Sequence, residues 1–118
     1  MKNTLRALAL FFLLTEPSWA QVTPWNRPST NASSTIASTS TFQNIWAANP
    51  GRSGCTIQNN GTHTMYVFFG PIANATLANS AQVASGASIY CAGQFGVVLR
   101  DQVSITGTSG DAFYANGQ

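Results

Sequence analysis

Short apolar runs between closely spaced turn residues are the feature that most limits how this chain can fold. From residue 42 onward, breaks such as Asn49-Pro50-Gly51 and Gly70-Pro71 interrupt the apolar runs before any of them shows a helical period of useful length. This pattern favours an all-β domain, a small antiparallel β-sandwich or barrel-like domain of about seven to eight short strands. We expect strands at residues 41–47, 55–58, 64–69, 75–77, 88–91, 97–100, 103–107 and 112–115.

The alternation of side chains along these strands predicts the core. Every second residue of a strand points to the same face. The inward set is then Cys55, Ile57, Met65, Val67, Phe69, Ala87, Ile89, Cys91, Phe95, Val97, Leu99, Val103, Ile105 and Gly107. Asn60-Gly61 is typical of a tight hairpin turn, because both residues tolerate positive φ, and Ser109-Gly110 is expected to turn a second hairpin.

The residues before this domain have a different composition. Residues 1–20 have the pattern of a cleaved secretory signal peptide: a basic start, a short apolar run and a small-residue site that ends at Ala20. Residues 21–41, rich in Ser and Thr, are expected to form a flexible arm or linker.

The remaining three arginines and two aspartates give the mature chain a formal charge of +1, which indicates neither nucleic-acid binding nor a polybasic membrane patch. We therefore expect a secreted or periplasmic protein with no membrane span after signal removal. Association with a cell surface or a virion is compatible with this location.

The two cysteines are expected to form one disulfide. Exported chains meet an oxidising compartment, where paired cysteines are usually bridged. Cys55 and Cys91 each fall on the inward face of a predicted strand. The sequence therefore predicts a Cys55–Cys91 bridge inside the β-domain, with two buried free thiols as the alternative.

Few residues of the mature chain suit catalysis. His63 is the single histidine and lies beside a predicted turn, and Asp101 and Asp111 are the only mature acids. A catalytic histidine needs a nucleophile and an orienting acid, and a glycosidase needs a carboxylate pair with one raised pKa. The sequence shows no phosphate-binding loop and no Cys/His cluster for a metal. We expect a non-enzymatic protein without metal or cofactor. A small hydrolase using Asp101 or Asp111 is the least favoured alternative.

Four aromatic residues are the remaining candidates for binding. Side-chain alternation places Tyr66, Phe68 and Tyr90 on the outward faces of their predicted strands, and we expect Trp46 to lie near them. The strand at 64–69 is apolar on both faces, so its outward residues form a second core layer, a subunit interface or a surface on which sugars stack. As an interface, these residues predict a homo-oligomer. As a sugar surface, they predict a secreted carbohydrate-binding module.

Several motifs of residues 41–118 resemble those of small β-domains encoded by phages and prophages of proteobacteria. The matching positions are Ala48-Asn49, Arg52, Gln58-Asn59, Tyr66-Val67, Phe69-Gly70, Ile105 and Gly110. The resemblance implies a virion-surface, fibre or decoration-like module without catalytic residues, and it favours a trimer. Together with the residue analysis, it predicts an exported structural or binding β-module that acts by surface association, with itself or with a virion or cell-surface component.

Overall fold

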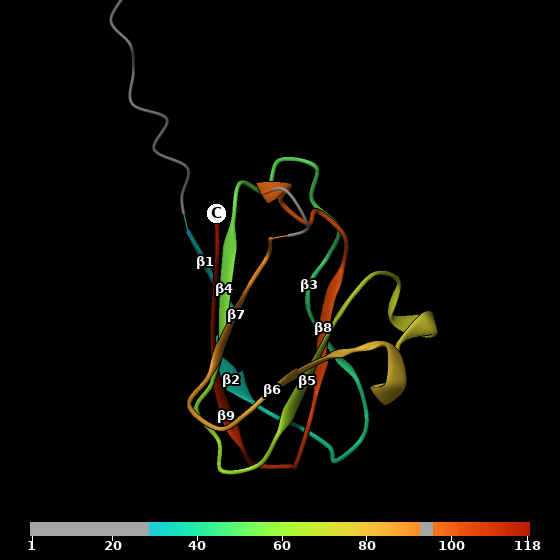
Figure 1. Ribbon diagram of the computed structural model, residues 1–118, viewed down its shortest axis with the longest axis vertical. Coiled ribbons are helices and arrows are strands. Elements are labelled where there is room, and N and C mark those ends of the chain that lie inside the picture. Colours follow the sequence, from blue (N-terminus) through green and yellow to red (C-terminus); the bar gives the residue numbers. More distant parts are fainter. Residues whose placement is uncertain (1–28, 93–95) are drawn as a thin grey trace, which may run out of the picture.

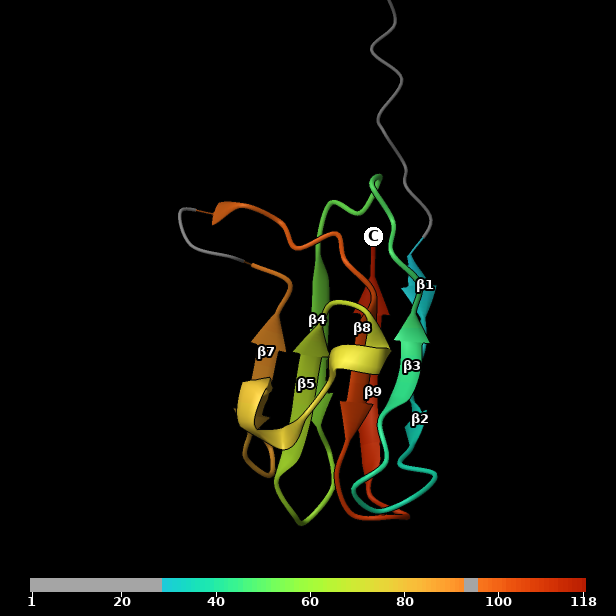
Figure 2. The ribbon, with the colours of Figure 1, turned by 90° about the vertical axis from the view of Figure 1, so that its right-hand side faces the viewer.

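Two antiparallel sheets pack face to face in this protein (Figures 1 and 2). The computed structural model describes residues 29–92 and 96–118. Sheet A has the order β1-β9-β4-β7, with β2 also pairing with β9, and sheet B has the order β3-β8-β5-β6. Sheet A consists of β1 (Thr30–Asn31), β2 (Ser34–Thr35), β4 (Cys55–Asn59), β7 (Ser88–Tyr90) and β9 (Ala112–Gly117). Sheet B consists of β3 (Gln43–Trp46), β5 (Met65–Phe69), β6 (Ala81–Val83) and β8 (Val103–Thr106). The predicted all-β sandwich is confirmed.

The strands pair in a nested order that defines a jelly roll. β2 pairs with β9, β3 with β8, β4 with β7 and β5 with β6, as in a long antiparallel ribbon rolled into two sheets. Every connection from β2 to β9 except the one between β5 and β6 therefore crosses from one sheet to the other. The two predicted hairpins at Asn60-Gly61 and Ser109-Gly110 are wrong for this reason, because each turn joins strands of different sheets.

The crossing from β4 to β5 is organised by a buried amide. The Asn59 side chain donates to the carbonyl oxygens of His63 and Val83, at 2.7 and 2.9 Å, and accepts from Gly61 N at 2.9 Å. Gly61 does not have the positive φ expected of it. It is needed for close approach instead, since a Cβ at this position would overlap the Asp111 side chain.

The core between the sheets follows the predicted alternation. Cys55, Cys91 and the central apolar residues of β4, β5 and β8 are buried as predicted. The core also contains four residues that the sequence analysis did not select: Ile36, Val83, Phe113 and Ala115. Val97 is 63% exposed, so its assignment to the core is wrong. Ala87 is exposed as well, and Phe95 lies outside the described residues.

The predicted disulfide between Cys55 and Cys91 is confirmed. Cys55 begins β4 and Cys91 follows β7, and their Cα atoms lie 4.9 Å apart. Cys91 N donates to Cys55 O at 3.0 Å, so the bridge continues the β4–β7 ladder by one residue. Both cysteines are buried in the core.

The chain enters the sandwich earlier than expected. β1 and β2 lie within residues 21–41, and Ile36, which follows β2, is only 2% exposed. The domain boundary at residue 42 is therefore wrong for residues 30–36, because this polar segment is held by backbone pairing with β9. The predicted signal peptide and residues 21–28 lie outside the described residues.

The segment between β5 and β6 is not the strand expected at residues 75–77. It forms two short 3-10 helices, η1 (Ile72–Asn74) and η2 (Leu77–Asn79), on the side of sheet B away from sheet A (Figure 2). Nor do residues 97–100 form a strand, since Val98 makes only an isolated bridge with Ala92. Within the described part of the chain, no helix is long and apolar enough to cross a membrane.

Candidate functional site

The four aromatic candidates do not form one surface. Tyr66 and Phe68 lie on β5 in sheet B, whereas Tyr90 lies on β7 in sheet A. Their strands are not neighbours, which corrects the expectation that these side chains lie side by side. Trp46, the last residue of β3, packs against the core at one end of the sandwich.

The outer face of sheet B is partly covered by the chain itself. Tyr66 and Phe68 are half-buried on this face, and Phe68 makes an edge-to-face contact with Phe42, with ring centroids 6.5 Å apart. The segment that contains η1 and η2 crosses in front of the same face (Figure 2). Much of the outward apolar surface of β5 is therefore covered by other parts of the same chain.

The outer face of sheet A is open and uncharged. We call it the tyrosine face. The strand register places the side chains of six residues on this side of the sheet: Thr56, Gln58, Ser88, Tyr90, Tyr114 and Asn116. Tyr90 is 62% exposed and Tyr114 is 37% exposed. None of the strands of this sheet contains a charged residue. The sequence analysis missed Tyr114. Side-chain alternation along the predicted strand at 112–115 could have identified it as an outward residue.

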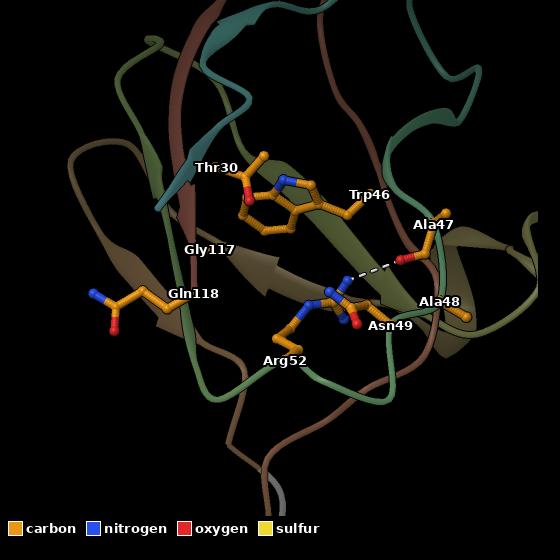
Figure 3. A pocket seen from close by; sticks show the side chains of 8 residues that line it. All are labelled: Thr30, Trp46, Ala47, Ala48, Asn49, Arg52, Gly117 and Gln118. Carbon is orange, nitrogen blue, oxygen red and sulfur yellow. Dashed lines mark hydrogen bonds between the residues drawn. The ribbon is translucent and has the colours of Figure 1, made fainter. Parts of the chain in front are cut away.

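A second candidate site surrounds the indole of Trp46 (Figure 3). This Trp46 pocket, of about 310 Å³, is lined by Thr30, Trp46, Ala47, Ala48, Asn49, Arg52, Gly117 and Gln118. Gly117 lies against the ring, where an added Cβ would be 3.3 Å from Trp46 Cζ2. Trp46 Nε1 is buried without a hydrogen-bond partner among the described residues.

Arg52 forms one wall of the Trp46 pocket and is almost fully buried. Its Nη1 donates to the carbonyl oxygens of Asp101 (2.7 Å) and Leu99 (3.3 Å), and its Nη2 donates to that of Ala47 (3.0 Å). The guanidinium carbon lies 5.6 Å from the centroid of the Trp46 ring, within the range of a cation–π contact. Burial lowers the pKa of Arg52, and the Asp101 carboxylate partly offsets this effect. Arg52 therefore ties two loops together more than it presents a free charge to a ligand.

A third polar cluster lies at the other end of the sandwich. The Asp111 carboxylate accepts from His63 Nδ1 at 3.0 Å, from His63 N at 3.1 Å and from Thr62 N at 3.4 Å. Burial alone would raise the pKa of Asp111, but these hydrogen bonds outweigh it, so the pKa lies below its ordinary value of 3.8. Asp111 thereby ties the β4–β5 crossing to the β8–β9 crossing.

This cluster does not have the geometry of a catalytic triad. The Thr62 hydroxyl lies 3.2 Å from His63 Nδ1, the same nitrogen that contacts Asp111. A catalytic triad needs the nucleophile on one ring nitrogen and the acid on the other. Asp101 precedes β8 and Asp111 follows it, so the two acids lie at opposite ends of the sandwich and do not form a glycosidase pair. Among the residues that the structure describes, no three His, Cys, Asp or Glu side chains could together hold a metal ion.

The Asp111 contacts predict a loss of stability in acid. A carboxylate whose pKa is lower in the folded state stabilises the fold above its unfolded pKa, and this contribution is lost as pH falls through the folded value. Denaturant titrations should therefore show the free energy of unfolding decreasing below about pH 4. The decrease should be smaller in Asp111→Asn than in the wild type, because the substituted side chain does not titrate. An unchanged pH profile in Asp111→Asn would contradict this role.

Comparison with known proteins assigns no family. No protein-family model matches the chain, and no curated protein matches it significantly. A solved structure from Bacillus endospore appendages, described as a novel family of disulfide-linked pili, is similar to it at 19% identity and a TM-score of 0.41. The match covers 76% of this chain and 81% of that chain. Similarity at this level carries no argument about function, which must be drawn from the chain's own surfaces.

Proposed function

We propose that this protein is an exported, non-enzymatic structural module that associates with further copies of itself through the tyrosine face. The observation that carries the proposal is an open sheet face with two exposed tyrosines and no charged side chain. Protein interfaces are enriched in tyrosine, and their centres are depleted of charged residues. A second copy presents the same uncharged surface, so pairing it with the first leaves no buried unpaired charge.

Three further observations agree with this function. The Cys55–Cys91 disulfide suits a protein that folds in an oxidising compartment, which supports the expected export. The His63 cluster lacks triad geometry and the two acids lie apart, which supports a role without chemistry. The resemblance to phage-encoded β-domains implies the same class of role, an assembling surface module of a virion or cell.

Self-association is tested by light scattering on the mature protein across a concentration series. We expect an oligomer at high micromolar concentration. Replacing both Tyr90 and Tyr114 by Ser should raise the dissociation constant by about 100-fold, since truncating an interface tyrosine costs about 1–2 kcal/mol. The matched control is Tyr66→Ser on the outer face of sheet B, which should leave the oligomer intact.

Two results would count against this proposal. A wild-type protein that stays monomeric at high micromolar concentration would exclude self-association as its function. Dissociation caused by Tyr66→Ser or Phe68→Ser, but not by the double substitution on the tyrosine face, would instead assign the interface to sheet B, the face to which the sequence analysis pointed.

A further inference from the structure

A hydroxyl-lined pocket opens on the outer face of sheet B, distinct from both the tyrosine face and the Trp46 pocket. This Thr106 pocket, of about 280 Å³, lies between the segment after β2, the end of β8 and η2. It is lined by Thr39, Ser40, His63, Thr64, Tyr66, Leu77, Thr106, Gly107 and Thr108. None of the lining residues is an acid, a lysine or an arginine.

One lining residue has an unmet hydrogen-bonding group. Thr106 is fully buried, and its Oγ1 has no hydrogen-bond partner among the described residues. It lies opposite Tyr66 in the β5–β8 ladder, so both side chains point to the same outer face. A buried hydroxyl without a partner is costly. The hydroxyl is covered in the free protein. A ligand that displaces part of this cover and offers the hydroxyl a donor or acceptor would therefore gain affinity from it.

The walls of the pocket are held in place by contacts within the chain. Ser40 has a φ of 59°, a conformation uncommon for a residue other than glycine, and its N donates to Gly107 O at 3.1 Å. Leu77 opens η2, whose start is closed by a reciprocal capping box between Thr76 and Asn79. Walls that are already ordered lose little conformational freedom when a ligand enters.

From this chemistry we propose that the Thr106 pocket binds a neutral sugar unit. Hydroxyl groups both donate and accept, so the serine and threonine side chains match the hydroxyls of a sugar in either sense. The Tyr66 ring and the exposed Leu77 side chain offer an apolar surface to the C–H face of a pyranose. The pocket is just below the usual range for drug-sized ligands, which suits one sugar unit. The Asp111 carboxylate, bonded to His63 beside the pocket, disfavours an anionic sugar.

The test is a titration of the isotope-labelled mature protein with single neutral sugars, followed by NMR. Glucose, galactose, mannose and N-acetylglucosamine are each added up to about 100 mM, because one sugar in a small pocket is expected to bind at about 1–10 mM. At least one should shift the amide signals of residues 39–40, 63–66 and 106–108 in a saturable way. Glucuronate, a charged counterpart, should bind more weakly.

Isosteric variants separate binding from folding. Thr106→Val replaces the unpartnered hydroxyl with a methyl group of similar size, so it should keep or raise the melting temperature, and it should weaken sugar binding by about tenfold. Ser104→Ala is the matched control, because Ser104 has an equally buried, unpartnered hydroxyl and does not line the pocket. The proposal is overturned if no neutral sugar gives saturable shifts, if glucuronate binds equally well, or if binding survives Thr106→Val unchanged.

Discussion

Reduction of the Cys55–Cys91 disulfide is expected to lower the melting temperature of the domain by about 15–30 °C. The bridge spans a separation of 36 residues. Closing a loop of that length removes unfolded-state entropy worth about 4 kcal/mol in the chain-entropy model. Single domains of this size are usually stable by about 5–15 kcal/mol, so the bridge supplies a large share of the total.

Calorimetry with and without a phosphine reductant measures this effect. The double variant Cys55→Ala/Cys91→Ala should melt near the temperature of the reduced wild type, and adding reductant to it should change nothing. This second comparison separates loss of the bridge from any other effect of the reductant. Equal melting temperatures for oxidised and reduced wild type, or two readily alkylated thiols in native exported protein, would refute the prediction.

The sequence predicted the strands and the core better than their connections. Alternation identified Ile57, Val67 and Ile105 as core residues because each lies on a strand with one face toward the opposite sheet. It failed for Val97, since residues 97–100 form no strand and the period of two has no meaning there. Asn-Gly and Ser-Gly predict hairpins because they indicate only the local backbone conformation of a turn. In a jelly roll the same residues carry the chain from one sheet to the other.

The N-terminal strands were missed for a related physical reason. β1 and β2 are short, polar and exposed, so no apolar pattern distinguishes them from a linker. They are held by backbone hydrogen bonds to β9, such as Ala32 N to Ala115 O at 2.9 Å, together with the single buried side chain of Ile36. Backbone pairing of this kind does not depend on particular side chains, so the sequence gives little indication of it.

The candidate surfaces depend on which sheet each strand joins. Side-chain alternation predicts that Tyr66, Phe68 and Tyr90 point outward, in agreement with the structure. Alternation cannot indicate whether two strands belong to the same sheet. The Thr106 pocket brings together residues 39–40, 63–64, 66, 77 and 106–108, which only the jelly-roll topology makes neighbours. No local motif could have indicated that pocket.

Replacement of Arg52 by Met is expected to destabilise the domain by about 2–4 kcal/mol, a fall in melting temperature of about 10–20 °C. Methionine keeps much of the apolar stem that packs beside Trp46 but has no donors. The carbonyl oxygens of Ala47, Leu99 and Asp101 would each lose a charge-assisted hydrogen bond. The backbone bond from Asn49 N to Arg100 O would still join the loop before β4 to the loop before β8.

The companion variants show whether the guanidinium shape or the charge matters. Arg52→Lys keeps the charge, but an ammonium cannot reproduce the planar fork that reaches carbonyls on both loops, so it should recover less than half of the lost stability. Arg100→Met is the matched control, because Arg100 is exposed and its loss should change stability by no more than about 0.5 kcal/mol. If Arg52→Met melts at the same temperature as the wild type, the three hydrogen bonds make no net contribution to the stability of the domain. If Arg52→Lys restores full stability, charge alone holds the two loops, and the fork geometry has no part in it.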